Sequence, residues 1–176
     1  KINCPTSAIS EEGREVGALS SGKPKDLKFN FVQGKSRIGE AMSPPLIKAV
    51  KKFGEKKKFS IQVLDCPPGT SCPVITAVEG TDFVILVTEP TPFGFYDLKL
   101  AVDVMKKLKL PFGVVINRSG DNDNLIEDWA KEKNIKILTK IPDDRRIAEY
   151  YSKGKLILKE LPEFKKYFEP LISIVK

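Results

Sequence analysis

The chain has 176 residues, which is enough for a single α/β domain with a sizeable core. Its net charge is +7, from lysines and arginines spread along the sequence without an arginine-rich block, so we do not expect a nucleic-acid groove. No apolar run is long enough to span a membrane. We therefore expect no membrane-spanning segment within these residues and no nucleic-acid partner.

No signal peptide is visible, although the chain begins without methionine, so that an upstream segment could have been removed. Three cysteines do not suggest a disulfide framework, and we therefore expect the reducing environment of the cytoplasm. Many Lys and Glu residues with few Gln favour a thermophilic source.

The polar, glycine-rich stretch at residues 11–24 nearly contains a phosphate-binding loop. The run from Gly17 to Lys23 fits the first seven positions of the pattern GxxxxGK[ST]. Pro24, however, stands where the loop requires a Mg²⁺-binding hydroxyl, and a proline there would interrupt the helix that should follow. No apolar strand precedes the run. We therefore reject a phosphate-binding loop at this position.

Two structured elements are expected between this stretch and residue 59. Lys28–Gln33 alternates polar and apolar residues and predicts a strand, and Ile38–Glu40 predicts a second short strand or a turn. Ser43 and Pro44 predict the N-cap and first turn of a helix. The buried face of this helix should consist of Leu46, Ile47 and Val50. We interpret the lysines around its end as a solvated basic face rather than a partner surface.

Three short apolar runs, rich in β-branched residues, predict buried strands at Ile61–Leu64, Phe83–Val87 and Phe112–Ile116. Apolar residues recur at helical spacing between the second and third runs: Leu98, Ala101, Val102, Met105 and Leu108. Strand, helix and strand at these lengths predict an α/β fold with a mainly parallel sheet and helices on both faces. Ligands of such sheets bind beyond the carboxyl ends of the strands.

The residues that follow these strands are therefore the candidate site. Asp65 ends the first run, and a carboxylate there can hold a hydrated Mg²⁺. Gly69 can offer its backbone N–H to a phosphate because no Cβ blocks the approach. Asn117 ends the third run, where its amide could pair with a nucleobase edge. Each also has a structural interpretation as a turn or capping residue.

Two further features of this region have alternative interpretations. Cys66 and Cys72 could bind an iron–sulfur cluster at a dimer axis, but a C-x₅-C pair lacks the spacing of a metal motif, which favours small residues in a tightly packed loop. Thr88–Pro92 contains two prolines and should be stiff. It is either part of a dimer or partner surface or a rigid connector.

The C-terminal third predicts two helices with a strand between them. Asp121 or Asn122 should cap the first helix, in which Leu125, Ile126 and Trp129 face inward, with Trp129 in the core. Ile135–Leu138 predicts the strand, and a polar loop precedes the second helix, which should stop at Gly154.

A last helix should begin at Pro162 and kink at Pro170. Its apolar residues recur at helical spacing and should cover the sheet: Leu161, Phe164, Phe168, Leu171, Ile172 and Val175.

The runs PPGTSCPV, VTEPTPFG, DLKLAV, VVINR and IPDDRRIAEYYSKG occur in this order along the chain. Together they resemble the MinD-type P-loop ATPases, of the MinD/ParA superfamily, that carry an inserted ferredoxin domain. The resemblance covers nearly the whole chain. It implies a MinD-like P-loop NTPase architecture whose N-terminal strand and phosphate loop are missing here. Residues 1–10 would be the tail of the ferredoxin-like insertion and residues 11–176 the C-terminal part of the nucleotide-binding domain.

By this resemblance, Asp65 is the Walker B aspartate, which holds Mg²⁺ through water, and residues 65–69 are switch II. Asn117 is the base-recognising residue, and the loop that flanks the base contains Pro142 and Asp143. The implied cofactors are ATP and Mg²⁺. The implied nucleotide-binding residues are Asp65, Pro67, Gly69, Asn117, Pro142 and Asp143.

The resemblance also concerns the cysteines. A single thiolate cannot hold a [4Fe–4S] cluster, which needs four. Cys4, followed by proline, is therefore either the remnant ligand of a cluster in the longer protein, which the resemblance favours, or a plain surface cysteine. If Cys66 and Cys72 lay at a dimer axis, they could bridge a cluster between two subunits, as thiolates at the switch loop do in nitrogenase iron-protein relatives, but the packing interpretation given above is the favoured one.

The expected function is ATP binding coupled to an iron–sulfur centre or partner, with the intact protein a homodimer and an iron–sulfur or redox protein as its partner. Whether the chain is an enzyme stays open, because the family hydrolyses ATP but the Walker A loop is absent here. One alternative is a non-enzymatic iron–sulfur scaffold or electron-transfer adaptor that uses ATP as a switch. The other is a MinD/ParA-type positioning ATPase, which we rank last because the end PLISIVK is too short and apolar for a basic amphipathic helix.

Overall fold

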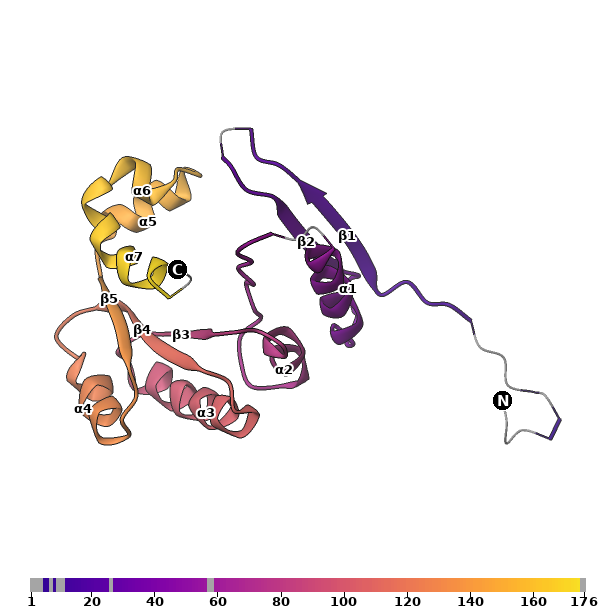
Figure 1. The fold of residues 1–176 in the computed structure, drawn as a ribbon, viewed down its shortest axis with the longest axis horizontal. Helices are drawn as coiled ribbons and strands as arrows, with labels where there is room; N and C mark the ends of the chain where they lie inside the picture. Colours follow the sequence, from indigo (N-terminus) through magenta and orange to yellow (C-terminus); the bar gives the residue numbers. More distant parts are fainter. Residues whose placement is uncertain (1–4, 7, 9–11, 26, 57–58, 175–176) are drawn as a thin grey trace. The chain divides into compact units, whose positions relative to one another are not determined.

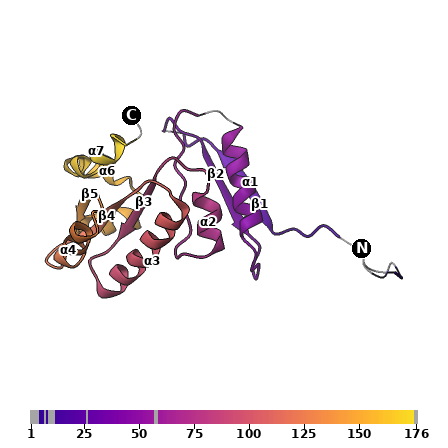
Figure 2. The ribbon, with the colours of Figure 1, turned by 60° about the horizontal axis from the view of Figure 1, so that its bottom comes forward.

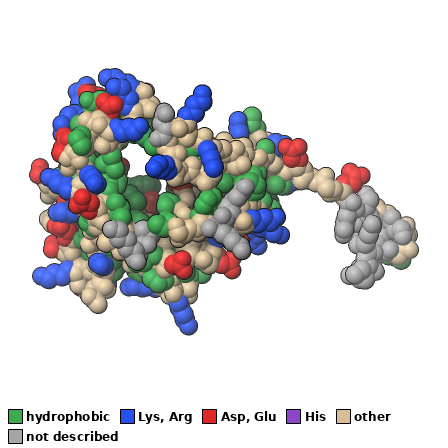
Figure 3. Space-filling model, turned by 45° about the horizontal axis from the view of Figure 1, so that its top comes forward, with side chains coloured by type: hydrophobic (Ala, Val, Ile, Leu, Met, Phe, Trp, Pro, Cys, Tyr) green, Lys and Arg blue, Asp and Glu red, His purple; other side chains and the backbone are tan. Residues whose placement is uncertain are grey.

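The computed structural model describes residues 5–6, 8, 12–25, 27–56 and 59–174. The chain forms two compact units, which are coloured by sequence in Figure 1. The first unit contains Lys1–Pro67 and Ser71–Ala77, and the second contains Pro68–Thr70 and Val78–Lys176. Lysine and arginine side chains are spread over the face seen in Figure 3 rather than gathered in one block.

The first unit is an antiparallel hairpin with a helix packed on it. Strand β1 (Gly17–Gly22) pairs with strand β2 (Phe31–Ser36), and helix α1 (Pro44–Glu55) contacts both strands. Helix α2 (Cys72–Val78) follows, and the Lys51 ammonium donates to the carbonyls of Thr76 and Ala77 at its end, at 3.1 and 2.9 Å. A cation is favourable there because the last carbonyls of a helix lack partners within the helix.

Two glycines allow α1 to lie close to the hairpin. A Cβ on Gly17 would lie 2.4 Å from the Lys35 carbonyl oxygen and 2.9 Å from a methyl carbon of Leu46. A Cβ on Gly34 would lie 2.8 Å from a methyl carbon of Val50. Any larger residue at either position would therefore push α1 or the neighbouring strand away.

The second unit is a parallel sheet of the order β3-β4-β5, formed by Val84–Thr88, Phe112–Ser119 and Ile137–Pro142. Its helices are α3 (Pro92–Leu108), α4 (Asn124–Glu132), α5 (Arg145–Ser152), α6 (Ile157–Glu160) and α7 (Lys165–Ile172), with a 3₁₀ turn η1 at Pro162–Phe164. Figures 1 and 2 show α3 and α4 on one face of this sheet and α7 on the other. The predicted α/β fold with a parallel sheet and helices on both faces is therefore confirmed.

The core of the second unit lies between β4, α3 and α4. It consists of Leu98, Val102, Val114, Ile116, Ile126, Ala130 and Ile135. Trp129 packs against this cluster and meets Phe95 edge to face, with ring centroids 5.5 Å apart. The prediction that Trp129 belongs to the core is confirmed.

Several predicted elements differ from the structure in the first unit. Ile61–Leu64 forms no strand, and Ile61 and Val63 are 50% and 90% exposed. An apolar β-branched run becomes a buried strand only beside neighbouring strands, and no described strand pairs with this one. We predicted no strand at residues 17–22, which form strand β1. Ile38–Glu40 is a turn, which was one of the two alternatives predicted for it, and the Glu40 amide donates to the Arg37 carbonyl at 3.1 Å.

Differences in the second unit are smaller. The first residue before α4 is Asp123 rather than Asp121 or Asn122, because residues 121–123 form a turn. Strand β5 begins two residues later than predicted and continues to Pro142. The short helix α6 was not predicted, and the last helix starts as the 3₁₀ turn η1. Pro170 lies inside α7, and Val175 lies outside the described residues.

Candidate functional site

The carboxyl ends of β3, β4 and β5 form the candidate site, and β4 is irregular there. Ile116 pairs with Lys140 and Ser119 with Pro142, so that two residues of β4, Asn117 and Arg118, lie opposite a single residue of β5. Arg118 has a positive φ of 52°. This is a β-bulge, which bends the strand and turns its side chains away from the regular alternation. A left-handed backbone at a bulky residue is uncommon and marks this point as a special one.

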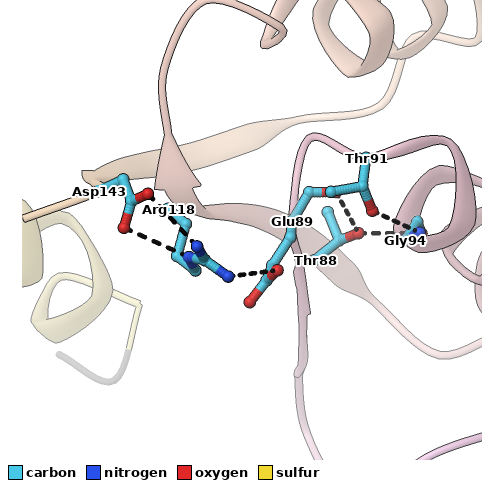
Figure 4. A network of polar contacts seen from close by, with 6 residues as sticks. All are labelled: Thr88, Glu89, Thr91, Gly94, Arg118 and Asp143. Carbon is cyan, nitrogen blue, oxygen red and sulfur yellow. Dashed lines mark hydrogen bonds and ion pairs between the residues drawn. The ribbon is translucent and has the colours of Figure 1, made fainter. Parts of the chain in front are cut away.

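Arg118 joins the ends of all three strands (Figure 4). Its Nε and Nη2 lie 3.3 and 3.4 Å from the two carboxylate oxygens of Asp143, beyond β5. Its Nη1 lies 3.4 Å from an Oε2 oxygen of Glu89, beyond β3. Hydrogen bonding to Asp143 raises the pKa of Arg118, so the guanidinium stays charged. These side chains are exposed, and the pairs therefore contribute more to positioning than to stability.

The loop after β3 holds Glu89 in place. Thr88 is buried, and its hydroxyl donates to the Gly94 carbonyl at 3.0 Å. Thr91 caps α3 by accepting a hydrogen bond from the Gly94 amide, also at 3.0 Å. A Cβ on Gly94 would lie 2.6 Å from the Glu89 carbonyl oxygen, so glycine is needed for this tight path. These local contacts fix the path of the loop, in agreement with the stiffness expected from its two prolines.

Asp123 stabilises the end of β4 through its buried carboxylate. It is only 6% exposed and accepts hydrogen bonds from the Ser119 hydroxyl at 2.6 Å and the Gly120 amide at 3.0 Å. The Lys140 ammonium on β5 lies 3.1 Å from the same carboxylate and 2.8 Å from Glu127. Burial raises the pKa of Asp123, but the hydrogen bonds and the Lys140 charge outweigh it and hold the pKa below its ordinary value.

The structure brings three of the predicted site residues to this one edge. Asn117 is half-buried at the bulge, Pro142 pairs with Ser119, and the Asp143 amide donates to the Ser119 carbonyl at 3.1 Å. Asn117 on β4 and the Pro142–Asp143 segment at the end of β5 therefore lie at the ends of adjacent strands. An asparagine amide both donates and accepts hydrogen bonds, which suits the edge of an adenine base.

The other predicted residues lie elsewhere in the chain. Asp65 and Pro67 belong to the first unit, and both are exposed. Gly69, in the stretch Pro68–Thr70, has a φ of 95°, a conformation that only glycine adopts without strain. An exposed carboxylate such as Asp65 fits the single protein ligand with which Mg²⁺ is often held beside a phosphate.

The described cysteines of one chain do not fit a cluster with four thiolate ligands. Cys66 donates its thiol to the Leu64 carbonyl at 3.7 Å, and burial together with the Asp65 charge raises the pKa of this thiol. Cys72 is exposed at the start of α2. Cys4 lies outside the described residues. No three Cys, Asp or Glu side chains gather as metal ligands in the part of the chain that the structure describes.

Sequence reasoning missed Arg118, Glu89 and Asp123 as parts of this site. The available signal was an arginine directly after a strand-end asparagine, with acidic residues just beyond the two neighbouring strands. Parallel strands place such residues at one edge, where they can pair.

No helix among the described residues is both long and apolar enough to cross a bilayer. The fold and the polar groups at its strand ends define an α/β protein of the kind that holds its ligand beyond the carboxyl edge of a parallel sheet.

Comparison with known proteins narrows this class. An uncharacterised protein of Methanocaldococcus jannaschii is 37% identical over 157 residues, which is 88% of this chain and 55% of the relative. The iron–sulfur cluster carrier protein of Pyrococcus horikoshii is 30% identical over 146 residues, which is 72% of this chain and 50% of the relative. The chain spans about half the length of these curated relatives. No family model matches it.

The crystal structure of the cell division ATPase MinD from Pyrococcus furiosus is also similar, with a TM-score of 0.61 and 29% identity. The match covers 74% of this chain and 59% of MinD. The chain belongs to the MinD/ParA superfamily of P-loop ATPases.

Proposed function

We propose that this chain binds ATP, with the adenine base held by Asn117 and by the loop at Pro142 and Asp143. The observation that carries the proposal is the bulge in β4, together with the pairing of Ser119 with Pro142, because these bring the three residues to one sheet edge. The name of the similar MinD protein, a cell division ATPase, supports the same ligand.

The phosphate side of the proposed site involves the loop after residue 64. Asp65 would hold Mg²⁺ through water, and Gly69 would present its amide to the γ-phosphate, with Pro67 in the same switch loop. The sequence contains no GxxxxGK[ST] run, so most of the phosphate contacts would come from outside residues 1–176. The base and Mg²⁺ sides of the site are the part that this chain would supply.

The relatives named as iron–sulfur cluster carriers support a coupling of this ATP site to an iron–sulfur centre or partner. The intact protein would be a homodimer around the nucleotide. The cluster would be a [4Fe–4S] cluster in the longer protein, with Cys4 as a remnant ligand. Cys66 and Cys72 would have to act together with those of a second copy, since one chain offers too few thiolates.

A second candidate is a non-enzymatic iron–sulfur carrier or electron-transfer adaptor in which ATP is only a switch. Two free cysteines favour it, Cys66 within the proposed switch loop and Cys72 three residues after it. Tight binding of ATP with very slow turnover would support this adaptor, whereas turnover that depends on a bound cluster would support an energy-coupling ATPase.

The test of ATP binding is a titration of the ¹⁵N-labelled chain with Mg-ATP, followed by NMR so that millimolar affinities can be measured. We expect saturable shifts at the ends of β4 and β5. Asn117→Ala should weaken binding about tenfold or more, because a paired amide–base contact is lost. Asn122→Ala, an exposed asparagine of the following turn, is the matched control and should bind like the unaltered chain. The proposal is wrong if the unaltered chain shows no saturable shifts or if both variants lose the same affinity.

A further inference from the structure

We propose that Arg118 makes the base site prefer adenine over guanine by occupying the carboxylate of Asp143. This inference rests on the proposed ATP site and concerns its selectivity. Arg118 would be a positioning residue, since it acts on the base through Asp143 rather than by direct contact.

The geometry of the Arg118–Asp143 pair is the first step. Nε and Nη2 of one guanidinium face the two different oxygens of one carboxylate, at 3.3 and 3.4 Å. Both oxygens of Asp143 are thus engaged by the planar fork of Arg118, an arrangement that lysine cannot reproduce. The Asp143 side chain is 57% exposed with Arg118 in place, so Arg118 does not cover the carboxylate. It engages the two oxygens in the bidentate pairing that a ligand with two neighbouring donors would need.

The chemistry of the two purines is the second step. Guanine presents two neighbouring donors, N1–H and the N2 amino group, to a carboxylate, which can accept from both at once. Adenine presents an acceptor at N1 and a donor at N6, and so gains no such pair. A free Asp143 beside the base would therefore favour guanine, and a carboxylate already engaged by a guanidinium would not.

The support for Arg118 in this position is the third step. The bulge and the left-handed backbone at Arg118 turn its side chain along the sheet edge, toward Asp143 on one side and Glu89 on the other. Glu89 faces Nη1, while Asp143 faces Nε and Nη2. Residues at the ends of three strands thus position one guanidinium. These contacts retain the left-handed backbone conformation of Arg118, which costs free energy by itself.

The experiment measures the dissociation constants of Mg-ATP and Mg-GTP for the full chain by the same NMR titration. Arg118→Met keeps the apolar stem of the side chain but removes the guanidinium. We expect it to raise the affinity for GTP relative to ATP about tenfold or more, as two hydrogen bonds to a charged acceptor allow. Arg118→Lys, which can engage only one oxygen at a time, should raise the ratio by a smaller factor.

Two controls separate this effect from a structural one. The double variant Arg118→Met/Asp143→Asn should return to the ratio of the unaltered chain, because an amide has only one acceptor oxygen and its NH₂ group cannot accept from the second guanine donor. Arg145→Met removes an exposed arginine that pairs with Glu149 of its own helix, and the ratio should stay unchanged.

The outcomes distinguish this inference from the function on which it rests. An unchanged ratio in both Arg118 variants overturns the inference, and so does a raised ratio that persists in the double variant, while ATP binding itself stands in either case. An unaltered chain that binds neither nucleotide overturns the ATP site and the inference together.

Discussion

Asp123 is the residue on which the end of β4 depends. Replacing it with alanine removes the acceptor for the Ser119 hydroxyl and the Gly120 amide, while Lys140 keeps its contact with Glu127. We expect Asp123→Ala to lower the free energy of unfolding by about 1–2 kcal/mol, because two part-buried hydrogen bonds to a charged acceptor are lost. Urea denaturation at pH 7 measures it, followed by the fluorescence of Trp129. Asp121→Ala, an exposed aspartate in the same turn, should change it by less than about 0.5 kcal/mol.

The same residue predicts a pH dependence. The pKa of Asp123 in the folded chain lies below its ordinary value, so its stabilising effect is complete above the ordinary pKa of about 4 and is lost as the pH falls through the lower folded pKa. We expect Asp123→Asn to reduce the loss of stability in acid relative to the unaltered chain. Equal slopes of the free energy of unfolding below about pH 4 would contradict the role given to this carboxylate.

The residues of the candidate site show which parts of the site could be predicted from the sequence and which could not. Asn117 could be proposed because it ends an apolar run, and the rule for parallel sheets brings such positions to one edge. Pro142 and Asp143 were proposed from the resemblance to MinD-type ATPases, and the structure places them beside Ser119 at the end of β4. The role of Arg118 could not be predicted, since the direction of its side chain is set by a bulge. The position of that bulge depends on how β4 pairs with β5. Asp123 was missed because the turn after β4 brings its carboxylate to the Ser119 hydroxyl and buries it. No local sequence pattern reveals this contact.

At the scale of elements, the contact between β1, β2 and α1 carries a prediction. Gly17→Ala would place a methyl group 2.4 Å from the Lys35 carbonyl oxygen, so the two strands must separate or α1 must shift. We expect a loss of about 1–3 kcal/mol in the free energy of unfolding of the first unit, the usual cost of overpacking. Urea denaturation followed by far-ultraviolet circular dichroism measures it.

Gly22→Ala is the matched control in the same strand. A Cβ on Gly22 meets no atom within 4 Å, so the variant should be nearly as stable as the unaltered chain. If Gly22→Ala costs as much as Gly17→Ala, the effect comes from the loss of glycine in a strand and not from the close approach of α1.

The elements that were predicted correctly are those whose own sequence is sufficient to determine their secondary structure. Helix α3 has a regular apolar face and a threonine cap, and β4 is a continuous apolar run buried on both faces. Strand β1 was missed because Gly17 is required by the close approach of Lys35 and of Leu46 on α1, which local propensity does not report. Ile61–Leu64 has the composition of a strand but no partner among the described strands, and strand formation requires one.

At the scale of the whole molecule, the two units hold separate sets of buried residues. Leu46 and Val74 are buried in the first unit, whereas the cluster around Val114 and Ile126 belongs to the second. The chain has one tryptophan, Trp129, and it packs against the second cluster. Its fluorescence therefore reports the unfolding of the second unit, whereas circular dichroism reports the secondary structure of both.

This arrangement allows the cooperativity of the chain to be tested with the two variants already described. Because each unit has its own core, we expect Asp123→Ala to lower the urea midpoint of the Trp129 fluorescence and Gly17→Ala to leave it unchanged. Circular dichroism should show an effect of both. If Gly17→Ala moves the Trp129 midpoint by as much as Asp123→Ala does, the units unfold as one cooperative body. A shared transition would also mean that a ligand bound at the end of β4 stabilises the hairpin and α1 through the folding equilibrium.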